Sequence, residues 1–578
     1  MMTVIINSSS MTCTKGKCIS SVIDNVTGGD AIANLFATKY DELYSSVDYD
    51  VREMDDLKEY VADKLRSRHC TDDCTITTAE VIDAVHSLHN GKRDGFHGLT
   101  TDHILYACQE LYAHIALLFS SLVSHGAVTD DLAFSTMIPI PKGKNNRNCT
   151  TSANYRSITM SSVLGKLFDR ILLNRYADSL TTSHLQFGFK KRHSTAMCSM
   201  VLKETIEYYS CNRGTTYCVM LDATKAFDRV QYCKLFRKLI DRNLPLVIIR
   251  FLLNMYTIHQ THVECNGANS RWFNVRNVKQ GGVLSPVLFC VYIDGLLNAV
   301  SEAGVGCHMG HMFVGALAYA DDIVLISPTV HGMRSMLNTC DEYAKDFDVV
   351  FNGSKSKCIV NRPRRKSAMC ADECDVRFSV GGQDIELVDN WPHLGHVISK
   401  DGDSKSDIAQ RRSKFIGQVN NVLCWFGKLD CSTKTRLLMS HCFDFYGCEL
   451  WDLSDIAVQS LCTAWRCALR RVWKLPYNCH KFILHVLSGS MPLMDAFCKR
   501  FYNFVCTCIN SENVIVKHVV RQGIFHSRML SCVGRNMQFL RERYETMGHR
   551  FDVGHDVSWA RNDRFFSRYW MDGWMVRV

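Results

Sequence analysis

Two adjacent aspartates, Asp321 and Asp322, interrupt an apolar run at residues 318–327, which read AYADDIVLIS. The neighbouring Tyr319 and Ile323 are typical of a strand that enters a core. Two carboxylates placed side by side there repel each other and lose hydration. Aspartate also suits turns, so the pair indicates either a plain hairpin turn or a hairpin tip that holds a divalent cation.

A third carboxylate, Asp222, ends the apolar segment 215–222, TTYCVMLD. If the two strand ends meet, three acidic groups gather, raise each other's pKa and destabilise the fold. Mg²⁺ would relieve this repulsion, because it prefers oxygen ligands and binds through a few carboxylates together with substrate phosphates. Two such ions can activate an attacking 3′-hydroxyl and stabilise a leaving pyrophosphate. Contact between these distant segments is an inference from their chemistry.

The segment between the acidic groups, VKQGGVLSPVLF at 278–289, carries Gln280, Gly281 and Gly282 ahead of a helix start at Ser285-Pro286. Proline suits the first turn of a helix. The pattern is typical of a hairpin-to-helix loop. Its glycines would also let a nucleotide or a template base approach the backbone closely.

The surrounding chain must supply the elements that position these groups. Apolar periodicity and turn signals predict helices at 77–92 (with Thr78 at the start and Glu80 in the first turn), 102–126 and 228–243, a strand at 135–142, and a hairpin at 260–278 that turns at Asn266-Gly267. Strands and helices thus interleave with hairpins, which favours an α+β fold. After about residue 405 the sequence becomes mostly helical and basic.

The composition bounds the class of protein. The 578 residues suffice for two to four domains, and 47% hydrophobic with 22% charged residues is typical of a globular chain. The net charge of +9 is compatible with a polyanionic partner. The apolar stretches 111–128 and 283–300 contain histidines, serines, Pro286 and Asp294, so we expect core helices and no membrane partner.

Three segments in one order resemble motifs A, B and C of reverse transcriptases: LDATKAFDRV (221–230), QGGVLSPVLF (280–289) and AYADDIVLIS (318–327). The chain is more specifically similar to the polymerases of non-LTR (LINE-like) retrotransposons. Further segments that resemble this family are NYRSITMSSVLGKLFDRIL (154–172), QFGFKKRHST (186–195), FNGSKSKCIV (351–360) and HLGHVIS (393–399). Seven ordered segments make the resemblance much more specific than a lone pair of aspartates.

The resemblance implies a right-hand polymerase of the α+β class. Fingers and palm, with an antiparallel palm sheet and helices, would precede a mainly helical thumb. We expect a partly helical N-terminal extension at 1–75, fingers and palm at 76–402 with a core at about 120–402, and a helical thumb and C-terminal nucleic-acid-binding region at 403–578.

The resemblance also assigns roles to single residues. Asp222 and Asp321 match the two aspartates that bind two Mg²⁺ ions, which Mn²⁺ could replace, Asp322 matches their neighbour, and the Ala223 carbonyl would be a further metal ligand. Phe227 matches the aromatic steric gate that leaves no room for a 2′-hydroxyl. The other implied substrate contacts are Gln280 and Gly281 beside the incoming nucleotide and template, Lys142 and Arg156 on the triphosphate, and Lys355 as a proton donor to pyrophosphate.

The implied function is RNA-directed DNA synthesis, with an RNA template, a DNA primer or target and deoxynucleotides as partners. The sequence itself leaves the compartment unknown, and only the resemblance to the family implies an intracellular ribonucleoprotein, nuclear and cytoplasmic. Departures such as Ser157 in place of a proline, and the expectation that no endonuclease domain fits in this chain, keep an inactive or domesticated nucleic-acid-binding remnant open. A maturase-like protein related to group II introns is a further alternative.

Overall fold

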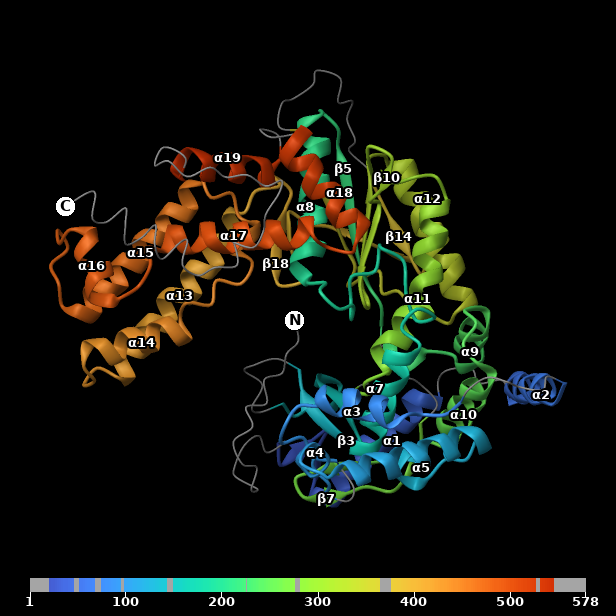
Figure 1. Cartoon of the computed structure of the whole chain (residues 1–578). Coiled ribbons are helices and arrows are strands. Elements are labelled where there is room, and N and C mark those ends of the chain that lie inside the picture. Colours follow the sequence, from blue (N-terminus) through green and yellow to red (C-terminus); the bar gives the residue numbers. More distant parts are fainter. Residues whose placement is uncertain are drawn as a thin grey trace.

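The computed structural model describes residues 20–45, 51–67, 74–94, 98–142, 149–224, 226–275, 281–363, 376–526 and 531–544. Gln280, one of the expected substrate contacts, lies outside these ranges. The described chain is a mixed α/β structure with two five-stranded sheets and a helical C-terminal part (Figure 1).

The first sheet has the strand order β11-β12-β5-β13-β16. Its strands are Ala316–Tyr319 (β11), Asp322–Ser327 (β12), Thr216–Asp222 (β5), Lys357–Asn361 (β13) and Glu386–Leu387 (β16). The sheet is antiparallel, as expected, except at its edge, where the short β16 runs parallel to β13. β5 lies in the middle, and every residue from 216 to 221 is buried, which explains its continuous apolar sequence.

Three long helices contact this sheet: α8 (Thr195–Cys211), α11 (Ser285–Glu302) and α12 (Val330–Asp346). α8 and α12 flank the strands in Figure 1. α11 begins with proline in its first turn, as the sequence predicts. The two hairpin strands β11 and β12 are therefore held in the core, and their connecting turn lies at one end of the sheet.

The second sheet has the order β4-β3-β6-β7, and β8 also pairs with β6. Its strands are Phe134–Pro141 (β3), Tyr155–Ser161 (β4), Gln260–Cys265 (β6), Ala268–Asn269 (β7) and Phe273–Asn274 (β8). Asn266 and Gly267 both have positive φ, so the predicted hairpin turn is confirmed. Helix α1 (Gly29–Ser45) covers this sheet and forms a separate small core with it.

The other helices before the helical C-terminal part are α2 (Val51–Ser67), α3 (Thr78–His86), α4 (Thr101–Leu105), α5 (Gln109–His125), α6 (Asp130–Ala133), α7 (Val163–Arg175), α9 (Tyr232–Asp241) and α10 (Leu246–Thr257). α3 begins at Thr78, as predicted, after the N-cap Thr77 that forms a capping box with Glu80, and it ends at His86, earlier than the predicted 92. The single helix predicted at 102–126 is in fact α4 and α5. None of the described helices is long and apolar enough to cross a membrane.

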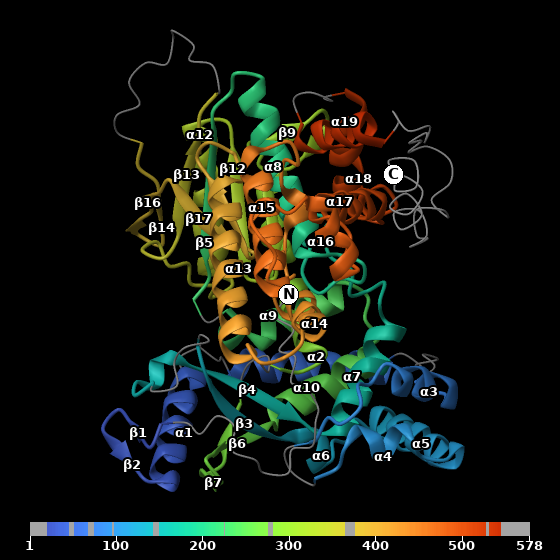
Figure 2. The same ribbon diagram turned by 90° about the vertical axis from the view of Figure 1, so that its left-hand side faces the viewer.

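The described chain after the hairpin β17 (Asn390–His393) and β18 (His396–Ser399) is helical. Its helices are α13 (Lys405–Trp425), α14 (Cys431–His441), α15 (Ile456–Trp473), α16 (Lys481–Ser488), α17 (Leu493–Ile509), α18 (Val514–Arg521) and α19 (Cys532–Tyr544). Figure 1 shows α13 running outward from β18 toward α14, on the side of the molecule that faces the viewer in Figure 2. We refer to residues 405–544 as the helical unit.

Short elements complete the structure. They are the strands β1 (Val22–Ile23), β2 (Val26–Thr27), β9 (His308–Met309), β10 (Met312–Phe313), β14 (Ser379–Val380) and β15 (Gln383–Asp384), with single helical turns at Ser152–Asn154 (η1), Ala226–Arg229 (η2), Cys448–Leu450 (η3) and Gln522–His526 (η4).

Candidate active site

The three acidic residues singled out in the sequence gather at one end of the first sheet. Asp222, the last residue of β5, lies directly opposite Asp322, the first residue of β12. Opposed residues of an antiparallel pair place their side chains on the same face, with Cβ atoms about 5 Å apart. Asp321 belongs to the turn that joins β11 to β12, next to Asp322. The hairpin tip and the strand end are therefore brought together, although about a hundred residues separate them in sequence.

The surroundings of Asp321 and Asp322 disfavour ionisation of both carboxyl groups. Burial, with repulsion from Asp321 and Asp222 added, raises the pKa of Asp322 to about 6. Burial also raises the pKa of Asp321, while the Arg156 guanidinium acts in the opposite direction. Because Asp322 still reaches solvent, water screens part of the repulsion. A group of carboxylates that is both reachable and mutually repulsive is a donor set that fits divalent cations.

The turn between β11 and β12 has an unusual backbone. Tyr319 and Asp322 pair with each other, so only Ala320 and Asp321 form the turn. Ala320 has a φ of +58°, a left-handed conformation that is uncommon for residues other than glycine. Positive φ at the first central position alone is the pattern of a type II′ turn, which matches the twist of a hairpin. The turn is tight, and it sets where Asp321 points.

A loop before β13 supports the end of β5. The amide of Asp222 donates to Ser356 Oγ at 3.1 Å, and the amide of Asn352 donates to the Asp222 carbonyl at 2.9 Å. Lys355, in the same loop, places its Nζ 3.9 Å from Asp222 Oδ2. The structure thus brings the predicted lysine to the carboxylate cluster.

The carbonyl of Ala223 is not used by the bridge that Ala223 forms with Phe351. The two hydrogen bonds around this bridge run from Thr224 N to Val350 O and from Asn352 N to Asp222 O. Such a bridge leaves the polar groups of its central residue on the other side of the strand. The arrangement is compatible with the ligand role that the resemblance implies.

Phe227 lies in η2, directly after β5. Its ring is half-buried and packs on Phe289 of α11, with ring centroids 4.6 Å apart. Arg229 fixes the same turn, because its Nη2 is 2.7 Å from Asp348 Oδ1. The ring is therefore held by Phe289, and the turn that carries it is held by the ion pair of Arg229.

The remaining predicted contacts lie on or against the second sheet. Arg156 is exposed on β4 and acts electrostatically on Asp321. Lys142 is exposed just after β3, and its Nζ donates to the Ala153 carbonyl at 2.8 Å. Gly281 has a φ of +118°, and a Cβ there would lie 2.6 Å from the Thr159 carbonyl oxygen of β4. Glycine is thus required where this loop touches the second sheet.

A residue that the sequence analysis did not single out also touches the site. Gln186 is fully buried, and its side chain hydrogen-bonds the backbone of Ala320 in the turn. A polar residue between buried apolar neighbours, as in LQF at 185–187, is the signal that could have drawn attention to it.

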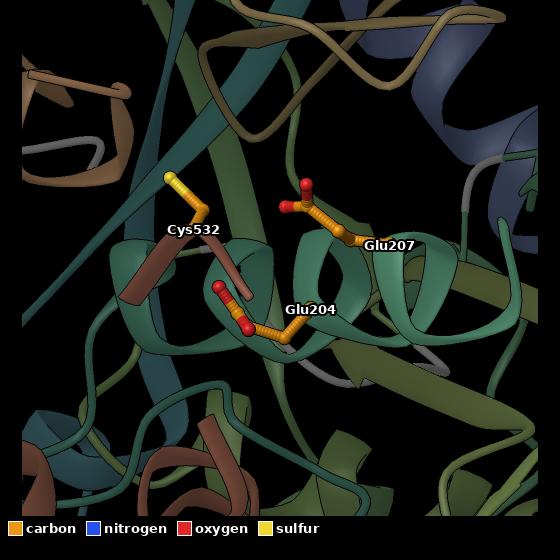
Figure 3. Close-up of side chains that lie close together, drawn as sticks. All are labelled: Glu204, Glu207 and Cys532. Atoms are coloured by element: carbon orange, nitrogen blue, oxygen red, sulfur yellow. The ribbon is translucent and has the colours of Figure 1, made fainter. Parts of the chain in front are cut away.

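A second cluster of possible metal ligands lies elsewhere, where α8 meets α19. Figure 3 shows Glu204 and Glu207 on α8 with Cys532 of α19. The carboxylates already have protein partners: Glu204 accepts from Ser531 Oγ at 2.5 Å and from Val533 N at 3.0 Å, and Glu207 lies 2.7 Å from Arg535. We therefore interpret this cluster as the anchor of α19 on α8.

Comparison with known proteins identifies the part of the chain that contains the three aspartates. Residues 140–418 match the family model described as reverse transcriptase (RNA-dependent DNA polymerase). This region belongs to the reverse transcriptase family. The match begins at the end of β3, includes β4 to β6 and β11 to β13, and ends within α13.

Relatives of this reverse transcriptase region are proteins of non-LTR retrotransposons. The Pol polyprotein from the R2 element of Nasonia vitripennis is 28% identical over 292 residues, covering 50% of this chain and 28% of that protein. The probable RNA-directed DNA polymerase from transposon X-element of Drosophila melanogaster is 25% identical, covering 65% of this chain and 41% of that protein. The RNA-directed DNA polymerase from mobile element jockey of Drosophila funebris is 25% identical, covering 63% and 40%. The matched region spans less than half the length of each of these proteins.

Proposed function

We propose that this chain is the RNA-directed DNA polymerase of a non-LTR retrotransposon and extends a 3′-hydroxyl primer on an RNA template with deoxynucleotides. The observation that carries the proposal is the pairing of Asp222 with Asp322, with Asp321 in the adjoining turn. This geometry supports a two-metal nucleotidyl transfer better than it supports a structural role, because repulsive carboxylates without a cation only cost stability.

Asp222, Asp321 and the carbonyl of Ala223 would hold two Mg²⁺ ions, with Asp322 beside them, and Mn²⁺ has the same preference for oxygen ligands. When bound, the ions would supply charge stabilisation to the attacking 3′-oxygen and to the leaving pyrophosphate. In this transfer the 3′-oxygen bonds to the α-phosphorus as the bond to pyrophosphate breaks. The rigid sheet that carries the carboxylates fixes the geometry of the in-line attack.

Basic residues supply the remaining charge. Arg156 and Lys142 would hold the triphosphate from the side of the second sheet, where Arg156 already acts on Asp321. Lys355, beside Asp222, would donate a proton to the leaving pyrophosphate. Phe227 would contact the sugar, with Phe289 behind it, and exclude a 2′-hydroxyl.

In this assignment the first sheet is the palm, the second sheet belongs to the fingers and the helical unit contains the thumb. The division at residues 75 and 402 and the role of Gln280 remain predictions. The relatives, which are all retrotransposon proteins, favour this function over an intron maturase.

The test is primer extension on poly(rA)–oligo(dT) with Mg²⁺. We expect the full chain to extend the primer and the double variant Asp321→Asn/Asp322→Asn to lose at least a thousandfold in rate. The matched control is Asp55→Asn/Asp56→Asn, which removes an adjacent exposed pair from α2 and should retain the parental rate.

Primer extension by the parent and by the control, but not by the Asp321→Asn/Asp322→Asn variant, would support the proposal. A folded parent that binds the template–primer but adds no nucleotide would instead support the nucleic-acid-binding remnant. Equal extension by the parent and the Asp321/Asp322 variant would remove these aspartates from the mechanism.

A further inference from the structure

The segment Leu185–Gly188 lies along β11 and reaches the hairpin tip. Phe187 N donates to the Ala318 carbonyl at 2.7 Å, and Ala318 N donates to the Leu185 carbonyl at 2.9 Å. Gln186 and Ala318 form a parallel bridge. The backbone of this segment is therefore fixed to the same strand that leads into the turn at Ala320 and Asp321.

The side chain of Gln186 completes the connection. Its Oε1 accepts from Ala320 N at 2.9 Å and from Gly188 N at 2.8 Å, and its Nε2 is 3.5 Å from the Ala320 carbonyl. Two N–H donors converge on one end of the amide, so that end must be the oxygen. The amide thus contacts both backbone polar groups of Ala320, the residue that precedes Asp321.

Ala320 needs such support because its backbone is strained. A left-handed conformation costs a residue with a Cβ about 1–2 kcal/mol and persists only where the surroundings enforce it. Gly188 also packs closely against Ala320, since a Cβ at position 188 would lie 2.5 Å from Ala320 N. The backbones of Gly188 and Ala320 are therefore in close contact.

We propose that Gln186 is a positioning residue that holds Ala320 in its left-handed conformation and so sets the placement of Asp321 and Asp322 opposite Asp222. The inference rests on the proposed function and adds a residue to its machinery that touches no substrate. Without this amide, the buried Ala320 N–H loses its acceptor, and the strained turn can move to a relaxed conformation that misplaces the carboxylates.

Two variants test the proposal in the full chain. Gln186→Met keeps the length and volume of the side chain but removes its hydrogen bonds, and Gln186→Asn keeps the amide but withdraws it from Ala320 by one methylene. Asn536→Leu is the matched control, because Asn536 is a buried amide that clamps the backbone of Trp451 and Leu453 in the helical unit. All three should lower the melting temperature.

The readouts are single-nucleotide addition, its Mg²⁺ midpoint, and Mn²⁺ binding measured by electron paramagnetic resonance. We expect both Gln186 variants to lose at least tenfold in kcat with little change in the KM for the nucleotide. Their Mg²⁺ midpoint should rise and their Mn²⁺ affinity fall, each at least threefold. The control should match the parent in both metal measurements.

A folded Gln186→Asn variant with the parental kcat, Mg²⁺ midpoint and Mn²⁺ affinity would overturn the proposal, whatever the fate of Gln186→Met. A parent that extends no primer would contradict the proposed function, whereas the Mn²⁺ measurement would still decide whether Gln186 places the carboxylates.

Discussion

Among single residues, the ionised carboxylate of Asp322 lowers the stability of the folded protein. The pKa of Asp322 is raised above its ordinary 3.8 to about 6 by burial and by two carboxylate neighbours. An acid whose pKa is raised in the folded state is destabilising once it ionises, so the cost is present at neutral pH. Solvent access to Asp322 keeps this cost small.

Replacing Asp322 by asparagine should therefore raise the melting temperature at pH 7.5 without divalent ions, by about 1 °C. The replacement removes a charge that Asp321 and Asp222 repel. Addition of Mg²⁺ should stabilise the parent more than Asp322→Asn, because the parent offers the additional carboxylate. Differential scanning fluorimetry with and without Mg²⁺ measures both effects, and a lower melting temperature of the metal-free variant would contradict this account.

The sugar preference is a second property of single residues. We expect Phe227→Ala to lower discrimination against ribonucleotides by roughly 10–100-fold, because the ring no longer occupies the volume of a 2′-hydroxyl. The measurement is kcat/KM for a ribonucleotide and for its deoxynucleotide. Phe313→Ala, a half-buried ring on β10 outside the cluster, is the control and should keep the parental ratio. If Phe227→Ala kept the parental ratio of the two kcat/KM values, Phe227 would not be the residue that excludes ribonucleotides.

At the scale of elements, the anchor between α8 and α19 connects the first sheet's helix to the end of the helical unit. Glu204 is fully buried there and accepts hydrogen bonds from Ser531 and Val533 at the start of α19. Burial, reinforced by Glu207, raises the pKa of Glu204 to about 7 from an ordinary 4.5. The folded protein therefore keeps a proton that the unfolded chain has released between pH 4.5 and 7.

Stability should consequently fall as pH rises through this window, because the folded state binds the additional proton. We expect Glu204→Gln, which remains neutral, to reduce the loss of melting temperature between pH 5 and pH 8 by a few degrees. Glu512→Gln, an exposed acid in the same part of the chain, should leave the pH profile unchanged. A parental pH profile in Glu204→Gln would show that Glu204 does not titrate there.

Local patterns in the sequence were sufficient for much of this architecture. The Asn266-Gly267 turn, the strand that ends at Asp222 and the helix that starts at Ser285-Pro286 follow from turn chemistry and periodicity. The break between α4 and α5 does not, because the Tyr112 hydroxyl caps the Ile104 carbonyl through a tertiary hydrogen bond. Helix propensity therefore predicts one continuous helix there, because it takes no account of this hydrogen bond.

The candidate site was predictable only in part for the same reason. The carboxylates could be recognised by their apolar neighbours in the sequence. Their proximity in space depends on the pairing of β12 with β5, which the resemblance implied and local sequence patterns did not. Gln186 was missed because its partners are backbone atoms of Ala320, far away in sequence. Hydrogen bonds to backbone leave no complementary side chain to recognise.

For the whole molecule, the net charge of +9 and the basic side chains of α13 bear on how the proposed polymerase would hold a nucleic-acid duplex. α13 packs against β18 and α15 and carries the exposed basic residues Arg412 and Lys414. Contacts with phosphates release counterions, so they weaken as salt increases and carry no sequence information. We therefore expect α13 to contribute to duplex affinity in a salt-dependent manner.

Neutralising Arg412 and Lys414 together should weaken binding of an RNA–DNA duplex and reduce the slope of log K against log salt by about 0.9 for each lost phosphate contact. Fluorescence anisotropy at several KCl concentrations measures both quantities. The control Lys58→Ala/Lys64→Ala removes the same net charge from α2, so any effect of total charge is matched. Because screening acts over about 10 Å at 0.1 M salt, a duplex held beside α13 should respond to the first pair alone. Equal losses in the two double variants would mean that the duplex responds to the overall charge of the protein, and the proposed placement along α13 would then be wrong.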